Sequence, residues 1–153
     1  MKGIRIAKKG LNNEMSGFVY IDPDANLATI GLNVHHSKTG QRFTLAHELG
    51  HIYLHKSAAG ALHVDEGDFF VRFRGPSSVS DSAHDEREAN AFAAKILMPR
   101  TFLERDFETG PDELSLSAEE TFLSELAGRY GVSRQALAFR LINLGLLDAA
   151  AFH

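Results

Sequence analysis

Five consecutive residues in the first half of the chain have types and spacing suited to binding a metal and moving a proton. His47, Glu48 and His51 form the pattern H-E-x-x-H, with the two histidines four positions apart. Residues four apart on a helix project from nearly the same side, so both imidazoles can bind one Zn²⁺ at about 2.0–2.1 Å. Glu48 would then stand beside the ion as a general base, taking a proton from an activated water and delivering it to a leaving amine.

The residues around this motif predict the helix that its spacing requires. Mostly apolar runs at 43–46 and 52–54 flank the motif at helical spacing. The expected helix covers 42–55 and begins at Thr44 or a near neighbour. A helix with incidental histidines is a weaker interpretation, because paired histidines around a glutamate on an apolar helix are hard to explain structurally.

The third protein ligand that a catalytic zinc site requires has to come from elsewhere in the chain. A third histidine six residues beyond His51 is absent, since Ser57 stands there. His55 lies four residues beyond His51, but three ligands on one straight helix would fan out along its axis. We therefore expect His55 to lie behind the ligands or at the surface.

A second predicted helix, about 85–97, offers carboxylates. Its apolar arc consists of Ala89, Phe92, Ala93, Ile96 and Leu97. At helical geometry Glu86 lies about 50° from the middle of that arc and Glu88 about 110° away. We predict Glu86 as the third ligand, with Glu88 as the alternative, and Asp85 as a capping residue.

Asn90, four residues after Glu86, is expected to hold one ligand imidazole through the ring nitrogen that faces away from the metal. A carboxylate would do this more strongly through its charge. An amide in this place therefore predicts slightly weaker zinc binding.

These residues resemble the ImmA/IrrE family of metallopeptidases. The resemblance is carried by residues 43–51 around the motif and by 86–94 with Leu97-Met98-Pro99, and the segment 126–146 is also similar. It covers roughly residues 28–147 of the chain and includes two dense motifs.

The resemblance implies a zincin-like domain in which two histidines and a glutamate hold zinc. In zincins of this type the glutamate ligand stands four residues before an Asp or Asn, as Glu86 does before Asn90. It also implies site-specific cleavage of a partner repressor of the helix-turn-helix type, or of an antitoxin, in stress responses or toxin–antitoxin pairs. With 153 residues, little room is left for the repressor-like or sensor domains that some members carry, so the trigger is left open.

The rest of the first 110 residues predicts an α+β body. Strands are expected near 4–6, at 17–21 and 28–34 as a hairpin, and at 69–73, with loop at 56–68 and a third helix over 100–107. We therefore predict a zincin-like metallopeptidase domain over 1–110, built of a short twisted sheet, the H-E-x-x-H helix and the glutamate-bearing helix.

The segment 111–153 is predicted to form a helical, helix-turn-helix-like tail. Helices are predicted over 117–130 and 134–144, the first with Ser117 and Glu120 as a capping box. A DNA-reading helix would present Arg134, Gln135, Phe139 and Arg140. Basic residues are sparse here and the chain is acidic overall, so we expect DNA binding less than a packing or docking role.

The composition excludes several classes of protein. The net charge is −4, there is no cysteine, and no apolar run exceeds four residues. A membrane helix needs roughly 20 such residues and a signal peptide about 7–15, so no membrane association is expected and a cytoplasmic location is predicted. Without cysteine, imidazole and carboxylate are the only strong ligands, which favours a catalytic zinc over a closed structural one.

The sequence thus predicts a zinc metalloendopeptidase that cleaves a partner repressor or antitoxin. The alternative is a non-proteolytic, zinc-stabilised regulatory module that binds a repressor or DNA. A donor to the oxyanion of the reaction would be one of His35, Tyr53, His63 and His84, and the sequence does not choose among them.

Overall fold

The computed structural model describes residues 3–55, 62–66, 81–110 and 116–151. The chain forms two compact units, Met1–Ala93 and Ala94–His153, which are described separately below. The first contains a sheet and two long helices, and the second is helical in its described residues. The fold class is α+β, as predicted, and the arrangement around the H-E-x-x-H motif is zincin-like. The domain boundary at residue 110 stays a prediction.

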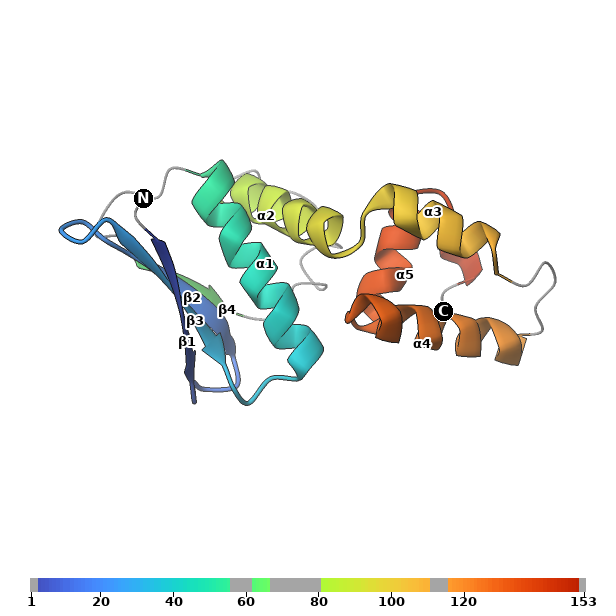
Figure 1. Ribbon diagram of the computed structural model, residues 1–153, viewed down its shortest axis with the longest axis horizontal. Helices are drawn as coiled ribbons and strands as arrows, with labels where there is room; N and C mark the ends of the chain where they lie inside the picture. The colour runs from blue at the N-terminus through green and yellow to red at the C-terminus, as the bar shows by residue number, and fades with distance from the viewer. Residues whose placement is uncertain (1–2, 56–61, 67–80, 111–115, 152–153) are drawn as a thin grey trace. The chain divides into compact units, whose positions relative to one another are not determined.

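Within the described residues, the sheet of the first unit has four strands in the order β1-β3-β2-β4 (Figure 1). These are β1 (Gly3–Lys9), β2 (Met15–Asp22), β3 (Leu27–Asn33) and β4 (Leu62–Glu66). β2 pairs antiparallel with β3, which confirms the predicted hairpin, and β1 joins β3 in parallel. Asn26 in the hairpin turn has a φ of 51°, a conformation that asparagine tolerates better than most residues.

The fourth strand corrects the sequence analysis, which predicted loop over 56–68. β4 pairs antiparallel with β2 through a register that joins Phe18 to Val64. Five residues at the edge of a sheet carry little local signal, because their hydrogen bonds depend on a partner far away in sequence. The strand predicted at 69–73 lies outside the described residues.

The helix that carries the H-E-x-x-H motif is α1 (Lys38–Leu54). It begins earlier than predicted, because Ser37 rather than Thr44 caps it and accepts a hydrogen bond from the Gly40 amide at 3.1 Å. Thr44 is instead buried inside the helix. The apolar face of α1 packs onto the sheet, where Leu45, Leu49 and Ile52 cover the cluster of Val19, Ile30 and Leu32.

The second long helix, α2 (Asp81–Leu97), lies beside α1. It begins four residues before the predicted start, so Asp85 stands inside the helix and the expected capping role is wrong. The two helices meet at Gly50, where an added Cβ would lie 3.0 Å from the Ala89 Cα and 3.2 Å from its carbonyl oxygen. A residue without a side chain therefore allows the backbones to approach closely, and this approach brings Glu86 to the histidines.

The second unit contains the predicted helices after Pro99. They are α3 (Arg100–Glu108), α4 (Leu116–Tyr130) and α5 (Arg134–Asn143), with a short 3₁₀ turn at Ala149–Ala151. Their core includes the fully buried side chains of Leu103, Leu126, Leu137 and Leu141. α4 begins one residue ahead of Ser117, the residue predicted to cap it.

The turn between α4 and α5 has the predicted helix-turn-helix outline. Gly131 has a φ of 62°, and Ser133 caps α5 by accepting from the Ala136 amide at 3.1 Å. Arg140, proposed above as a groove-facing residue, donates from Nε to the Met98 carbonyl at 3.2 Å. Burial lowers the pKa of Arg140. This arginine thus tethers α5 to the start of its own unit. Within the ranges that the structure covers, none of the helices has both the length and the apolar character needed to traverse a bilayer.

The Gly50 contact predicts a stability difference between two glycine positions. We expect Gly50→Leu to lower the free energy of unfolding by about 1–3 kcal/mol, because the new side chain overpacks the α1–α2 contact. Gly128→Leu is the matched control, since a Cβ at Gly128 meets nothing within 4 Å. It should raise stability slightly through its helix propensity. Denaturant unfolding of both variants measures this, and equal destabilisation would contradict the packing argument.

Candidate metal centre

Three side chains from α1 and α2 converge at the place where the helices approach. The ligand atoms of His47, His51 and Glu86 all lie within 4.8 Å of one another. The Nε2 atoms of the two histidines are 3.0 Å apart, and the Glu86 oxygens lie 3.3 Å from His47 Nε2 and 3.1 Å from His51 Nε2. The structure thus brings together the three residues predicted as ligands.

These separations fit the edges of a tetrahedral coordination shell. For ligands about 2.0–2.1 Å from a zinc ion, neighbouring donor atoms in a tetrahedron are about 3.3 Å apart. The three observed distances, 3.0, 3.1 and 3.3 Å, lie at or slightly below that value. Two imidazole nitrogens and a carboxylate oxygen also form a donor set that zinc prefers, with a fourth position left for water or substrate.

The proton of the His47 ring is placed by Asn90. His47 Nδ1 lies 2.8 Å from Asn90 Oδ1, and both residues are buried. An amide oxygen only accepts hydrogen bonds, so Nδ1 of His47 carries the donated proton. With the ring neutral, Nε2 then presents a lone pair to the centre of the group. The hydrogen bond expected of Asn90 is therefore present.

The His51 ring is held by a longer chain of contacts. His51 Nδ1 lies 3.1 Å from His55 Nδ1, and His55 Nε2 lies 3.0 Å from Glu88 Oε2. A carboxylate only accepts, so a neutral His55 donates from Nε2 to Glu88 and accepts at Nδ1. His51 then donates from Nδ1, and its Nε2 presents a second lone pair to the centre.

The electrostatics of these contacts favour a cation at the centre. Two ring lone pairs and the Glu86 carboxylate point at one another across 3.0–3.3 Å, and all three would be attracted by a positive ion. Behind them, the hydrogen bond from His55 is the main reason that the pKa of Glu88 is lowered below its usual value. Glu88 therefore stays an acceptor at neutral pH.

Glu48 lies on the same helix between the two histidines and is fully buried. Its Oε1 is 3.8 Å from the position that a Cβ on Gly17 would take. That same position would lie 2.6 Å from Thr44 Cγ2 and from the Gly31 carbonyl oxygen. The glycine on β2 thus leaves the space in which the side chains of Thr44 and Glu48 face the sheet.

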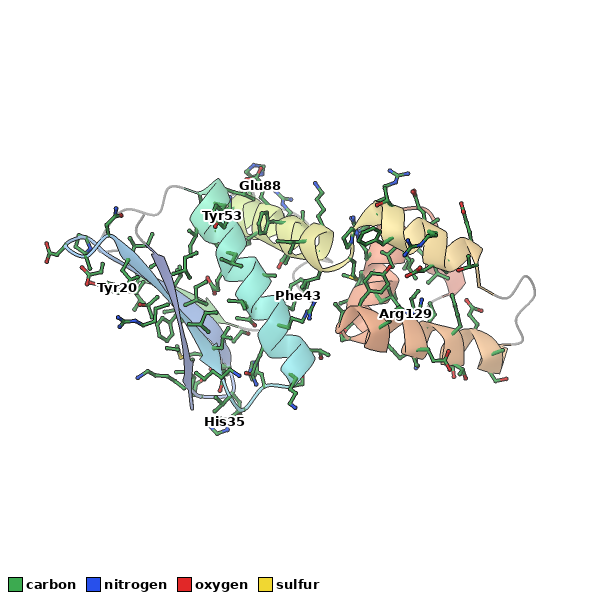
Figure 2. The ribbon with its side chains drawn as sticks, viewed as in Figure 1. Tyr20, His35, Phe43, Tyr53, Glu88 and Arg129 are labelled. Atoms are coloured by element: carbon green, nitrogen blue, oxygen red, sulfur yellow. The ribbon has the colours of Figure 1, made fainter. Side chains whose placement is uncertain are left out.

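The other predicted candidates lie outside the group formed by His47, His51 and Glu86, which is called the inner group below. Glu88, the alternative third ligand, contacts His55 rather than His47 or His51 in this arrangement. Tyr53 is 68% exposed and stacks on Phe92, while His84 pairs with Glu88 at 3.4 Å. Figure 2 shows His35 at the opposite end of α1 from Tyr53 and Glu88. The side chain of His63 is not among those described.

The series of contacts from His51 through His55 to Glu88 is the part of the site that the sequence analysis did not predict. His55 was expected behind the ligands or at the surface, and Glu88 was considered only as the alternative third ligand. The signal was present in the four-residue spacing of His51 and His55, which continues the spacing of the motif. What was missing was the pairing of α1 with α2 that brings Glu88 to His55.

The Asn90 contact predicts a loss of both stability and metal affinity. In Asn90→Leu, the Nδ1 proton of His47 would be buried without its acceptor, so the metal-free chain should lose about 1–3 kcal/mol of unfolding free energy. Metal affinity should fall about 10–100-fold, because the ring is no longer held in one tautomer. Denaturant unfolding and competition with a chelator measure the two effects. Asn143→Leu, at an exposed position, is the control and should change neither.

The comparison with family models places this site in a known group. The model described as the IrrE N-terminal-like domain, Peptidase_M78, matches residues 1–142, which include both units' helices through most of α5. The comparison with curated proteins gave no match. The match covers the H-E-x-x-H helix, the glutamate-bearing helix and most of the tail. The chain therefore belongs to the Peptidase_M78 family of IrrE N-terminal-like domains, whose function is of the metallopeptidase type.

Proposed function

We propose that this chain is a zinc-dependent endopeptidase that cleaves a partner transcriptional repressor or antitoxin and so relieves repression. His47, His51 and Glu86 are the proposed zinc ligands, and Glu48 is the proposed general base. The observation that carries the proposal is the convergence of two imidazole nitrogens and a carboxylate at 3.0–3.3 Å, with Glu48 buried on the same helix.

The donor chemistry supports zinc over harder cations. Imidazole nitrogens suit zinc, whereas magnesium and calcium prefer shells made of oxygen. The outer contacts of both rings favour the neutral tautomer with a lone pair on Nε2, which is the form that binds a metal. When bound, zinc would polarise the scissile carbonyl and make water acidic enough to attack near neutral pH.

The work of the chain's own residues is to hold the centre and to move a proton. Glu48 takes a proton from the attacking water as its oxygen bonds to the carbonyl carbon. Glu48 then gives that proton to the amide nitrogen as the C–N bond breaks, so a carboxylate and an amine are released. The buried position of Glu48 limits its contact with bulk water, which favours transfer to the substrate.

The class of substrate is supported by the family and by the motifs rather than by a contact in the structure. The family model covers nearly the whole chain. The choice of a helix-turn-helix repressor as the substrate rests on the resemblance of both motifs to the ImmA/IrrE family. Glu48→Gln separates cleavage from a purely binding role, because it removes the proton acceptor while leaving the three proposed ligands in place.

We expect Glu48→Gln to keep its zinc and to lose about 10²–10⁴-fold in cleavage rate. The zinc-loaded chain would be incubated with a helix-turn-helix repressor encoded in the neighbouring reading frame. Gel electrophoresis and mass spectrometry would follow the products. Glu108→Gln, at an exposed position on α3, removes an equal charge and should leave the rate unchanged. If Glu48→Gln relieved repression as fully as the original chain in a reporter assay, the binding module would be the better explanation.

The ligand set predicts different metal contents for two neighbouring glutamates. Glu86→Ala should abolish the zinc that survives dialysis, because it removes a direct ligand. Glu88→Ala should retain that zinc with affinity lowered only about 10–100-fold, since Glu88 acts through His55 and His51. Metal analysis of the dialysed variants measures this. Loss of zinc in Glu88→Ala alone would overturn the choice of Glu86.

A further inference from the structure

A second group of possible metal ligands, called the outer group below, lies where α1 ends, with one member directly after α1 and two on α2. The ligand atoms of His55, Asp85 and Glu88 lie within 4.8 Å of one another. His55 Nε2 is 3.0 Å from Glu88 Oε2 and 3.5 Å from Asp85 Oδ1. These distances bracket the separation of about 3.3 Å between neighbouring ligands of a tetrahedral zinc ion. On the other side of Glu88, His84 Nε2 lies 3.4 Å from Oε1.

This outer group is accessible to ions from solvent. The side chains of Asp85 and Glu88 are 44% and 47% exposed, whereas that of His55 is 14% exposed. A partly buried imidazole between two solvated carboxylates offers a mixed nitrogen and oxygen donor set, and water can complete the shell. The contact of His55 Nδ1 with His51 holds the ring so that Nε2 faces both carboxylates.

We propose that His55, Asp85 and Glu88 form an outer site for a divalent transition-metal cation such as Zn²⁺, and that its occupation opposes occupation of the inner group. The outer site stands on its own geometry. The opposition rests on the proposed function, because it assumes that His47, His51 and Glu86 bind zinc.

The opposition follows from the protons of the His51–His55 contact. At 3.1 Å the two Nδ1 atoms can share only one proton. When the inner group is ready to bind metal, His51 carries that proton at Nδ1 and His55 carries its own at Nε2. A cation on His55 Nε2 needs the reverse arrangement, in which His55 is protonated at Nδ1 and donates to His51.

The proton count balances without changing the charge of either ring. One proton leaves His55 Nε2, the shared proton moves from His51 Nδ1 to His55 Nδ1, and one proton arrives at His51 Nε2. That last proton occupies the atom that would bind the inner metal. While both rings stay neutral, both sites can be filled only if the hydrogen bond between the two histidines is given up, which weakens whichever ion binds second.

The first test counts zinc ions on the full chain by equilibrium dialysis and metal analysis. We expect one tight equivalent and a second, weaker one that binds below about 1 mM free Zn²⁺. Asp85→Asn should weaken the second equivalent at least about tenfold and leave the first in place, because Asp85 pairs with His55 and belongs to the outer group. Asp24→Asn, in an exposed turn, is the charge-matched control and should change neither.

The outcomes separate the two proposals. The outer site would be overturned if the chain bound one zinc equivalent and no second, or if Asp85→Asn left the affinity for the second equivalent unchanged. Either result would leave the proposed function intact. If the full chain bound only the weaker equivalent, the proposed function would be contradicted. The effect of Asp85→Asn on that weaker equivalent would still test the outer site.

A second measurement tests the opposition itself. In Glu86→Gln, which lacks an inner ligand, the outer site should bind Zn²⁺ at least about tenfold more tightly than in the chain already loaded with one equivalent. Nitrogen-15 resonances of the His55 ring should show the proton on Nε2 with one equivalent bound and on Nδ1 after the second. Equal outer affinity in the two chains, or a His55 ring that keeps its proton on Nε2, would overturn the opposition.

Discussion

The close approach of α1 to α2 is the contact on which the rest of the site depends. α1 supplies both histidines and α2 supplies the carboxylate and the amide, so neither helix forms the group alone. Gly50 permits the approach, since an added Cβ would meet the Ala89 backbone at 3.0 Å. The sheet fixes the other face of α1 through Leu45, Leu49 and Ile52. The histidines are thereby held between two packed surfaces, which is the preorganisation a metal centre needs.

The hydrogen bonds behind the ligands differ in kind for the two histidines. His47 is held by one buried amide, whereas His51 is held by a second imidazole that ends on a solvated carboxylate. The first contact has a fixed acceptor and one proton arrangement. The second has one arrangement while Glu88 accepts from His55 Nε2, and it would take the reverse arrangement if a cation occupied that nitrogen. The two helices therefore provide one rigid ligand and one whose state depends on its surroundings.

Local spacing predicted the elements better than it predicted their pairing. The four-residue spacing of His47 and His51 and the angular position of Glu86 depend only on helix geometry, and the structure places all three together. The start of α1 was missed because Ser37 lies before the apolar pattern begins. β4 and the His55–Glu88 contact were missed because each depends on a partner more than 30 residues away in sequence. Such contacts arise from tertiary packing, which no local window contains.

Because Gly17 has no side chain, β2 influences how much space surrounds the carboxylate of Glu48, the proposed base. The strand and the helix share one small volume there, filled from one side by Thr44 and bordered by Glu48. The depth at which the Glu48 carboxylate sits is therefore set by the sheet as much as by its own helix. A side chain at position 17 would therefore narrow the space beside the Glu48 carboxylate from the strand, without any change in the helix that carries the glutamate.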